Sequence, residues 1–121
     1  MRAFLAIAAI AAALTTPAVA QTDRGASTRA FVNMCVARAQ GMSNPEPTCA
    51  CGAGVISGRM DDRQYTMMGR FAPHTGNGEA MRAEVRNMLN EGYSADEIRT
   101  VGQMLIDLEG PINSACRVLE R

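Results

Sequence analysis

The chain has 121 residues and no net charge, because its 12 basic residues, all arginine, balance 12 acidic ones. This balance argues against nucleic acids and anionic membranes as partners, since both select a surplus of basic residues. Aromatic residues make up only 4% of the chain, so its core must be built mainly from methionine and aliphatic side chains.

Residues 1–20 have the pattern of a cleavable secretory signal peptide. Arg2 gives a positive start, residues 3–14 contain no polar side chain, and a small-x-small triplet ends at Ala20. The apolar core is shorter than the roughly 20 residues that span a bilayer. The sequence therefore predicts cleavage after Ala20, a periplasmic or secreted protein, and no membrane insertion after cleavage.

A flexible lead-in is expected at residues 21–26. The first helix is predicted over residues 28–40, with Ser27 as its N-cap and Gly41 at its end.

A second helix is predicted over residues 45–57, because Asn44 can serve as its N-cap and Pro45 suits the first helical position. This helix carries Gly52, Gly54 and Gly58, which predict close approach of a neighbouring helix, and Gly54 and Gly58 also form a small-xxx-small pair.

Asp61 and Gln64 have the spacing of a capping box and open a third helix, which ends before Pro73. Asn77 can cap a fourth helix, which ends at Gly92.

Ser94 and Glu97 form a full capping box for a fifth helix. Apolar residues then recur at steps of three and four, the spacing of one helical face: Ile98, Val101, Leu105, Leu108, Ile112, Cys116 and Leu119. The Gly110-Pro111 pair should break this helix, with both parts facing one core.

No segment alternates with a period of two, so strands are not expected. The predicted fold class is all-α: a small disulfide-stapled bundle of four to five helices after a cleaved signal peptide. Residues 27–121 should form its single domain.

The four cysteines of an exported chain of this size imply disulfides. A Cys49–Cys51 bridge is disfavoured, because side chains two apart on a helix point about 200° apart. Cys35 and Cys49 lie about 7 and 6 Å from the predicted turn between the first two helices, so they should be level. The favoured pairing is Cys35–Cys49 with Cys51–Cys116; the pairing Cys35–Cys51 with Cys49–Cys116 stays open.

Two kinds of site chemistry have candidate residues. Cys49-Ala-Cys51 could act as a redox dithiol, but structural bridges are favoured in an oxidising compartment. Soft Cu(I) could use thioethers and imidazole, with these candidates: Met60, Met67, Met68, His74 and Met81. Methionine is more simply a core filler in a chain poor in aromatics, so neither a metal site nor a cofactor is predicted.

No pattern of catalytic residues stands out. Ser57 lies one place too late for a nucleophile elbow, and no nucleophile is marked for His74, the only histidine. Pairs of carboxylates fall where helix N-termini favour negative charge. The sequence therefore predicts no catalytic residue and no enzyme.

The chain resembles small uncharacterised periplasmic helical proteins of proteobacteria with four cysteines. This resemblance rests on Phe31 with Cys35, Cys49-x-Cys51, residues 62–68 and Cys116. Cys51-Gly52, Ile56-Ser57-Gly58 and Asp61 are also similar to a helix of four-cysteine immunity proteins of type VI secretion. Neither resemblance implies catalytic residues.

A stapled helical domain without a catalytic centre predicts a periplasmic protein-binding or interaction module: an inhibitor, an immunity protein or a chaperone-like factor. Its partner would be another protein of the periplasm or envelope, met by residues 72–78 and the methionines around them. The alternatives are a copper-binding or thiol-redox accessory protein and a structural envelope protein.

Overall fold

A computed structural model describes residues 16–120 of the chain, with side chains from Arg24 to Leu119. Its elements are α1 (Thr16–Ala37), α2 (Pro45–Ser57), α3 (Asp62–Phe71), η1 (Ala72–His74), α4 (Gly78–Asn90), α5 (Ala95–Asp107), α6 (Glu109–Cys116) and η2 (Arg117–Glu120). The described part contains no strand, which confirms the predicted all-α class. Most of the predicted leader lies outside the described residues, so the leader and its cleavage stay predictions.

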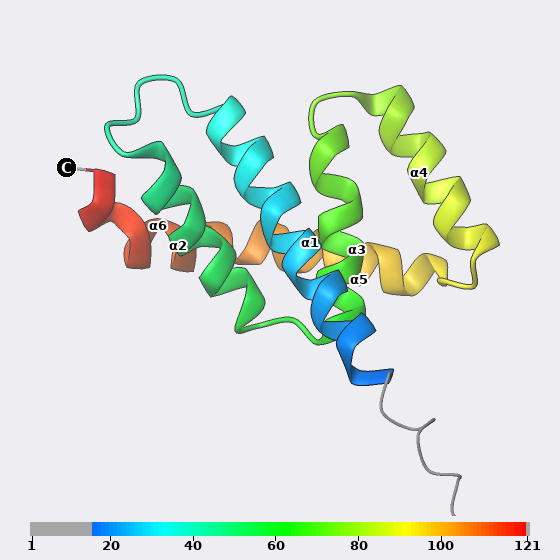
Figure 1. The fold of residues 1–121 in the computed structure, drawn as a ribbon. Helices are drawn as coiled ribbons and strands as arrows, with labels where there is room; N and C mark the ends of the chain where they lie inside the picture. Colours follow the sequence, from blue (N-terminus) through cyan, green and yellow to red (C-terminus); the bar gives the residue numbers. More distant parts are fainter. Residues whose placement is uncertain (1–15, 121) are drawn as a thin grey trace, which may run out of the picture.

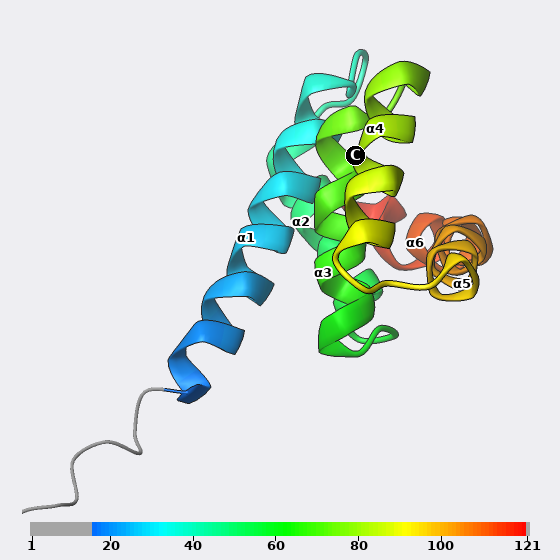
Figure 2. The same ribbon diagram turned by 90° about the vertical axis from the view of Figure 1, so that its right-hand side faces the viewer.

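The helices form two layers. Helices α2, α1, α3 and α4 lie side by side in that order, with α1 and α3 running in one direction and α2 and α4 in the opposite one (Figure 1). Helices α5 and α6 cross one face of this layer, and Figure 2 shows α5 nearly end-on at the side. Contacts of α3 with both α1 and α5 make it the central helix of the fold.

Helix α1 begins earlier than the sequence predicted. It is continuous through residues 21–26, so the expected flexible lead-in and the N-cap role of Ser27 are both wrong. Ser27 is buried in the middle of α1 and faces Gly69 of α3. A Cβ atom at Gly69 would lie 2.6 Å from the Cα of Ser27, so the two helices touch backbone to backbone here.

Arg24 gives the physical reason for the early start of α1. Its guanidinium donates to the Asp62 carboxylate at 2.7 Å and to the Ser57 carbonyl at 2.6 Å. The same group lies 4.6 Å from the centre of the Tyr65 ring. These contacts tie the part of α1 just before Ser27 to α2 and α3, and a local capping argument cannot detect tertiary contacts of this kind.

Three of the predicted N-caps are confirmed. The Asp61 side chain accepts from the Gln64 N–H at 2.8 Å, and the Gln64 side chain accepts from the Asp61 N–H at 3.1 Å. Asn77 caps α4 by accepting from Ala80, and Ser94 with Glu97 forms the reciprocal capping box of α5. Local sequence therefore defines the starts of α3, α4 and α5.

Asn44 precedes α2 as predicted, but its side chain does not cap the helix. Pro47 occupies the third helical position and has no backbone N–H that could donate a hydrogen bond to a capping side chain. The Asn44 side chain instead donates to the carbonyl oxygen of Leu119 at 2.9 Å, which links the start of α2 to η2.

The predicted break of the last long helix is confirmed, at Leu108 between α5 and α6. Val101 and Leu108 are buried, and Ile98, Leu105 and Ile112 pack against the same core. Both helices therefore face one core, as predicted. Its most deeply buried large side chains are Tyr65, Ile56, Met67, Met68, Met88 and Val101.

The close helix approach predicted at the glycines of α2 is confirmed at Gly52 and is wrong at Gly54 and Gly58. No atom of a neighbouring element lies within 4 Å of a Cβ built at Gly54, and one at Gly58 meets only carbonyls of its own helix. The glycine of α2 that does meet neighbours is Gly52, where a Cβ would lie 3.4 Å from the Phe31 ring and 3.5 Å from Ile112.

Candidate functional site

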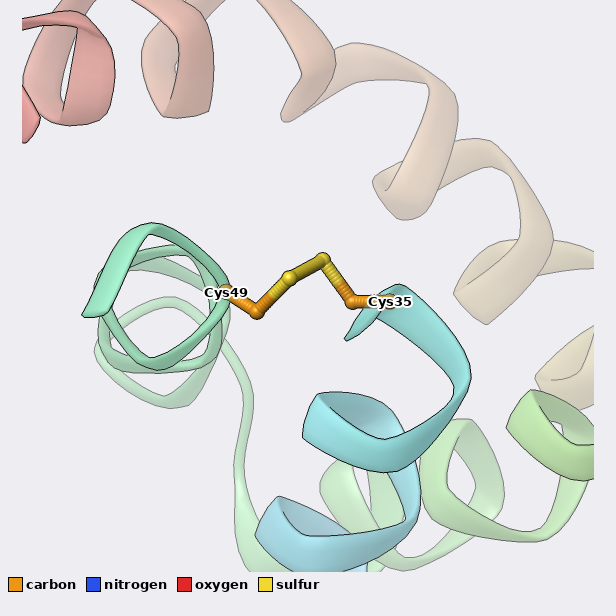
Figure 3. Close-up of a disulfide and its surroundings, with 2 residues drawn as sticks. All are labelled: Cys35 and Cys49. Atoms are coloured by element: carbon orange, nitrogen blue, oxygen red, sulfur yellow. A yellow bond between two sulfur atoms is a disulfide. The ribbon is translucent and has the colours of Figure 1, made fainter. Parts of the chain in front are cut away.

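Two disulfides join the end of the molecule where α1, α2 and α6 meet. Cys35 of α1 is bonded to Cys49 of α2 (Figure 3), and Cys51 of α2 is bonded to Cys116 of α6. This is the pairing that the sequence favoured, in which the neighbouring cysteines of α2 reach different partners. All four cysteines are bonded, so the chain presents no thiol for redox chemistry in this state.

One prominent hollow of the described structure is a cavity of about 470 Å³, which we call the large lobe. Its walls come from all six α-helices and η1 and are almost entirely apolar: Phe31, Met34, Ile56, Met68, Phe71, Ala72, Met81, Leu105 and Ile112. Thr75, Glu109 and Asn113 add the only polar side chains. A cavity of this size and character is typical of a site for an apolar group.

A second cavity of about 180 Å³, the small lobe, lies next to the first. The two lobes share Phe31, Ile112 and Asn113, and together we call them the binding groove. The other walls of the small lobe are Cys35, Met42, Thr48, Cys49, Gly52, Cys116 and Arg117. Three bonded cysteines thus line it, so the two disulfides fix its shape.

Thr48, which borders the small lobe, has an unpaired buried hydroxyl. Thr48 is 7% exposed, and its Oγ1 has no hydrogen-bond partner in the structure. Buried polar atoms are almost always paired, and an unpaired one calls for an explanation. Arg117 lines the same cavity, and no ion pair joins it to another described side chain.

The five copper candidates do not form one site. Met60 and Met67 are buried core residues, and Met67 adjoins a different hollow beside Asp61 and Glu97. His74 faces Glu84, with 3.9 Å between its Nε2 and a carboxylate oxygen. Of the five, only Met68 and Met81 line the same hollow, the large lobe. Among the described residues, no group of three His, Cys, Asp or Glu side chains is placed to hold a metal ion.

The surface predicted around residues 72–78 is only partly accessible. Most of this segment is exposed, but Met60, Met67 and Met68 are buried beneath it or elsewhere in the core. Ala72 and Thr75 are its only residues in the groove. Residues 72–78 therefore border the groove on one side, and the three buried methionines do not contribute to an exposed surface.

Several groove residues were missed by sequence reasoning. Thr48, Asn113 and Arg117 belong to no motif in the sequence. One signal was present: Glu109, Asn113 and Arg117 recur every four residues beside Ile112 and Cys116. This spacing places polar and apolar side chains on one face of α6.

Comparisons of the chain with family models, with curated proteins and with solved structures found no match. Within the described residues, none of the helices is both long and apolar enough to cross a membrane. The two disulfides are consistent with an oxidising compartment outside the cytoplasm.

Proposed function

We propose that this protein is a non-catalytic binding module, active in the periplasm or after secretion, which holds an apolar segment of another protein in its groove. The observation that carries the proposal is the large lobe, a cavity of about 470 Å³ with almost wholly apolar walls. Protein interiors are close-packed, so an empty hollow of this size would cost a small bundle packing contacts. A group from a partner that fills the hollow would restore those contacts.

The side chains of the large lobe also suit a protein partner. Met34, Met68 and Met81 come from three different helices and line the same cavity. Methionine is flexible and polarisable, so a wall of methionines adapts to apolar side chains of different shape. This supports the chaperone-like or inhibitor roles predicted from the sequence over a purely structural role in the envelope.

Site-specific photo-crosslinking tests the proposal. A photoreactive residue at Asn113, which is exposed at the groove, should give a defined adduct with an envelope protein in living cells. The same residue at Arg59, exposed and outside both lobes, serves as the positional control. Equal adducts from both positions, or no adduct from either, would contradict a groove-bound partner.

A blocking variant makes the test specific. Thr75 is exposed at the edge of the large lobe, so Thr75→Phe should place a ring over the groove and abolish the Asn113 adduct. Thr100→Phe adds the same ring beside a separate hollow on α5 and should leave the adduct unchanged. An adduct that survives Thr75→Phe would mean that the partner does not enter the large lobe.

A further inference from the structure

One rim of the binding groove carries two opposite charges. Glu109 lines the large lobe, Arg117 lines the small lobe, and Asn113 lines both. The three residues recur every four positions, so they mark one face of α6 that follows the groove. A rise of about 1.5 Å per residue separates Glu109 from Arg117 by about 12 Å along this face. Among the described residues, these two are the only charged ones in the walls of the two lobes.

Both charged groups are available to a partner. Glu109 and Arg117 are exposed, and no ion pair joins either of them to another described side chain. Because they are exposed, they would meet charges that flank an inserted apolar group, not a group inside the hollow. Exposed ion pairs add little affinity, but opposite charges at the two ends of a groove discriminate between partners.

The apolar walls of the large lobe favour a helical occupant. Peptide N–H and C=O groups that leave water need hydrogen-bond partners. Of the residues that line the lobe, only Thr75, Glu109 and Asn113 are polar, and all three are exposed. The described part of the chain has no strand whose edge could pair with an extended segment. A helix pairs its own backbone groups, so its apolar face can cover the lobe without leaving them unpaired.

The dimensions of the groove agree with a helix that lies along it. A helix is about 10 to 12 Å wide with its side chains, so a hollow of about 470 Å³ receives the side chains of one face and not the whole helix. Apolar anchors at positions i, i+3, i+4 and i+7 of a helix span about 10 Å. This length fits between Glu109 and Arg117, which then lie beside the residues that flank the anchors.

We propose that the groove binds an amphipathic helix of a partner protein, with the apolar face of that helix over the large lobe, a basic residue beside Glu109 and an acidic residue beside Arg117. Met34, Met68 and Met81 receive the apolar anchors, because their flexible side chains line the lobe. This inference rests on the proposed function, since it requires that a protein segment occupies the groove.

Three helix-forming peptides with blocked termini test the charges. Each has leucines at i, i+3, i+4 and i+7. The mixed peptide has a lysine before the first leucine and a glutamate after the last, whereas the acidic peptide has glutamate and the basic peptide lysine at both places. Binding to the oxidised protein is followed by NMR of the methyl groups of Met34, Met68 and Met81. The mixed peptide should bind about threefold more tightly than either of the others, the effect expected from exposed ion pairs.

Two charge reversals should change the preference in opposite directions. Glu109→Arg makes both ends of the rim basic and should give the acidic peptide the highest affinity. Arg117→Glu makes both ends acidic and should favour the basic peptide. Arg59→Glu changes the net charge as Arg117→Glu does, but it lies outside both lobes and should preserve the preference for the mixed peptide. An unchanged ranking of the peptides in both groove variants would overturn the inference.

A fourth peptide tests the helix. Proline at the centre of the mixed peptide breaks a helix, so this peptide should not bind. The mixed peptide should gain helical circular dichroism in the complex. Equal binding of the proline peptide would mean that the occupant is extended, which would overturn the inference and leave the proposed function intact.

Two further outcomes would identify a different occupant, and each would overturn the inference. Decanoate that shifts the methionine methyl signals, when no peptide does, would assign the large lobe to a lipid chain. A dimer that Thr75→Phe disrupts would assign the lobe to a second copy of this chain. Absence of binding by every peptide would also overturn the inference, whereas the proposed function is decided separately by the adduct at Asn113.

Discussion

Helices α1, α2 and α6 are joined by two covalent bridges, whereas α3, α4 and α5 are joined by methionine packing and salt bridges. The first region contains Cys35–Cys49 and Cys51–Cys116. In the second, Arg70 of α3 reaches Glu84 and Glu91 of α4, both at 2.6 Å. Two regions of one small bundle therefore depend on bonds of very different strength and sensitivity to solvent.

The difference follows the position of the groove. The small lobe is lined by bonded cysteines, so this part of its wall is held in place before a ligand arrives. Preorganisation of this kind reduces the entropy lost on binding. The salt bridges of the other region lie at the surface, where protonation and salt weaken them. The disulfide-bonded region is thus suited to form a preorganised binding site. The ionic region is the one that low pH or high salt can destabilise.

Removal of the disulfides should have the largest effect on stability. The Cys51–Cys116 bridge spans 65 residues and the Cys35–Cys49 bridge spans 14. Loop-closure entropy predicts a loss of about 4 kcal/mol for Cys51→Ala with Cys116→Ala, and about 3 kcal/mol for Cys35→Ala with Cys49→Ala. Urea denaturation would measure both. Equal losses would mean that strain or residual unfolded structure, not loop length, determines the ranking.

Gly69→Ala should have the next largest effect, because it acts where the two regions meet. The added Cβ would lie 2.6 Å from the Cα of Ser27, so α1 and α3 would have to move apart. We expect a loss of about 2 to 3 kcal/mol, seen as a lower Tm. Gly54→Ala is the control: its Cβ meets no neighbouring element, and it should stabilise α2 by up to about 1 kcal/mol. A neutral Gly69→Ala would contradict the close packing of α1 on α3.

Arg70→Met should destabilise the ionic region by about 1 to 2 kcal/mol, since it leaves the half-buried Glu84 without its strongest partner. The Arg70 side chain is 27% exposed and that of Glu84 is 16% exposed. Arg99→Met removes a pair with Asp96 in which both side chains are largely exposed, and should change stability by less than about 0.5 kcal/mol. Thermal unfolding at low and high salt checks both, and equal effects of the two variants would count against a role for burial.

Low pH should also destabilise the ionic region by protonating Glu97, and we expect this loss of stability to be smaller than that of Arg70→Met. The hydrogen bond from Arg63, followed by that from the Ser94 N–H, lowers the pKa of Glu97 to about 2. A carboxylate with a lowered folded-state pKa stabilises the fold above its unfolded pKa, and this contribution is lost as the pH falls towards 2. Glu97→Gln should therefore flatten the decline of stability between about pH 4.5 and 2. An unchanged pH profile in this variant would contradict the contribution of Glu97.

Much of the fold could be predicted because its signals are local. Asp61, Asn77 and Ser94 cap their helices through side chains that reach only three residues along the chain. The break near Gly110-Pro111 follows from backbone geometry, and the favoured disulfide pairing follows from distances along a helical hairpin. The start of α1 was missed because Arg24 is held by residues more than 30 positions away.

The sequence by itself determined the all-helical class, three helix starts and the faces that turn inward, because capping and periodicity act within a few residues. Only the tertiary structure decided which glycines lie at a helix contact, Gly69 and Gly52 but not Gly54 or Gly58, and where the packing leaves space. The groove is bordered by residues from all six α-helices, so it is a property of the gaps between them. Periodicity identifies an apolar face, but the volume left between several such faces depends on how all of them pack.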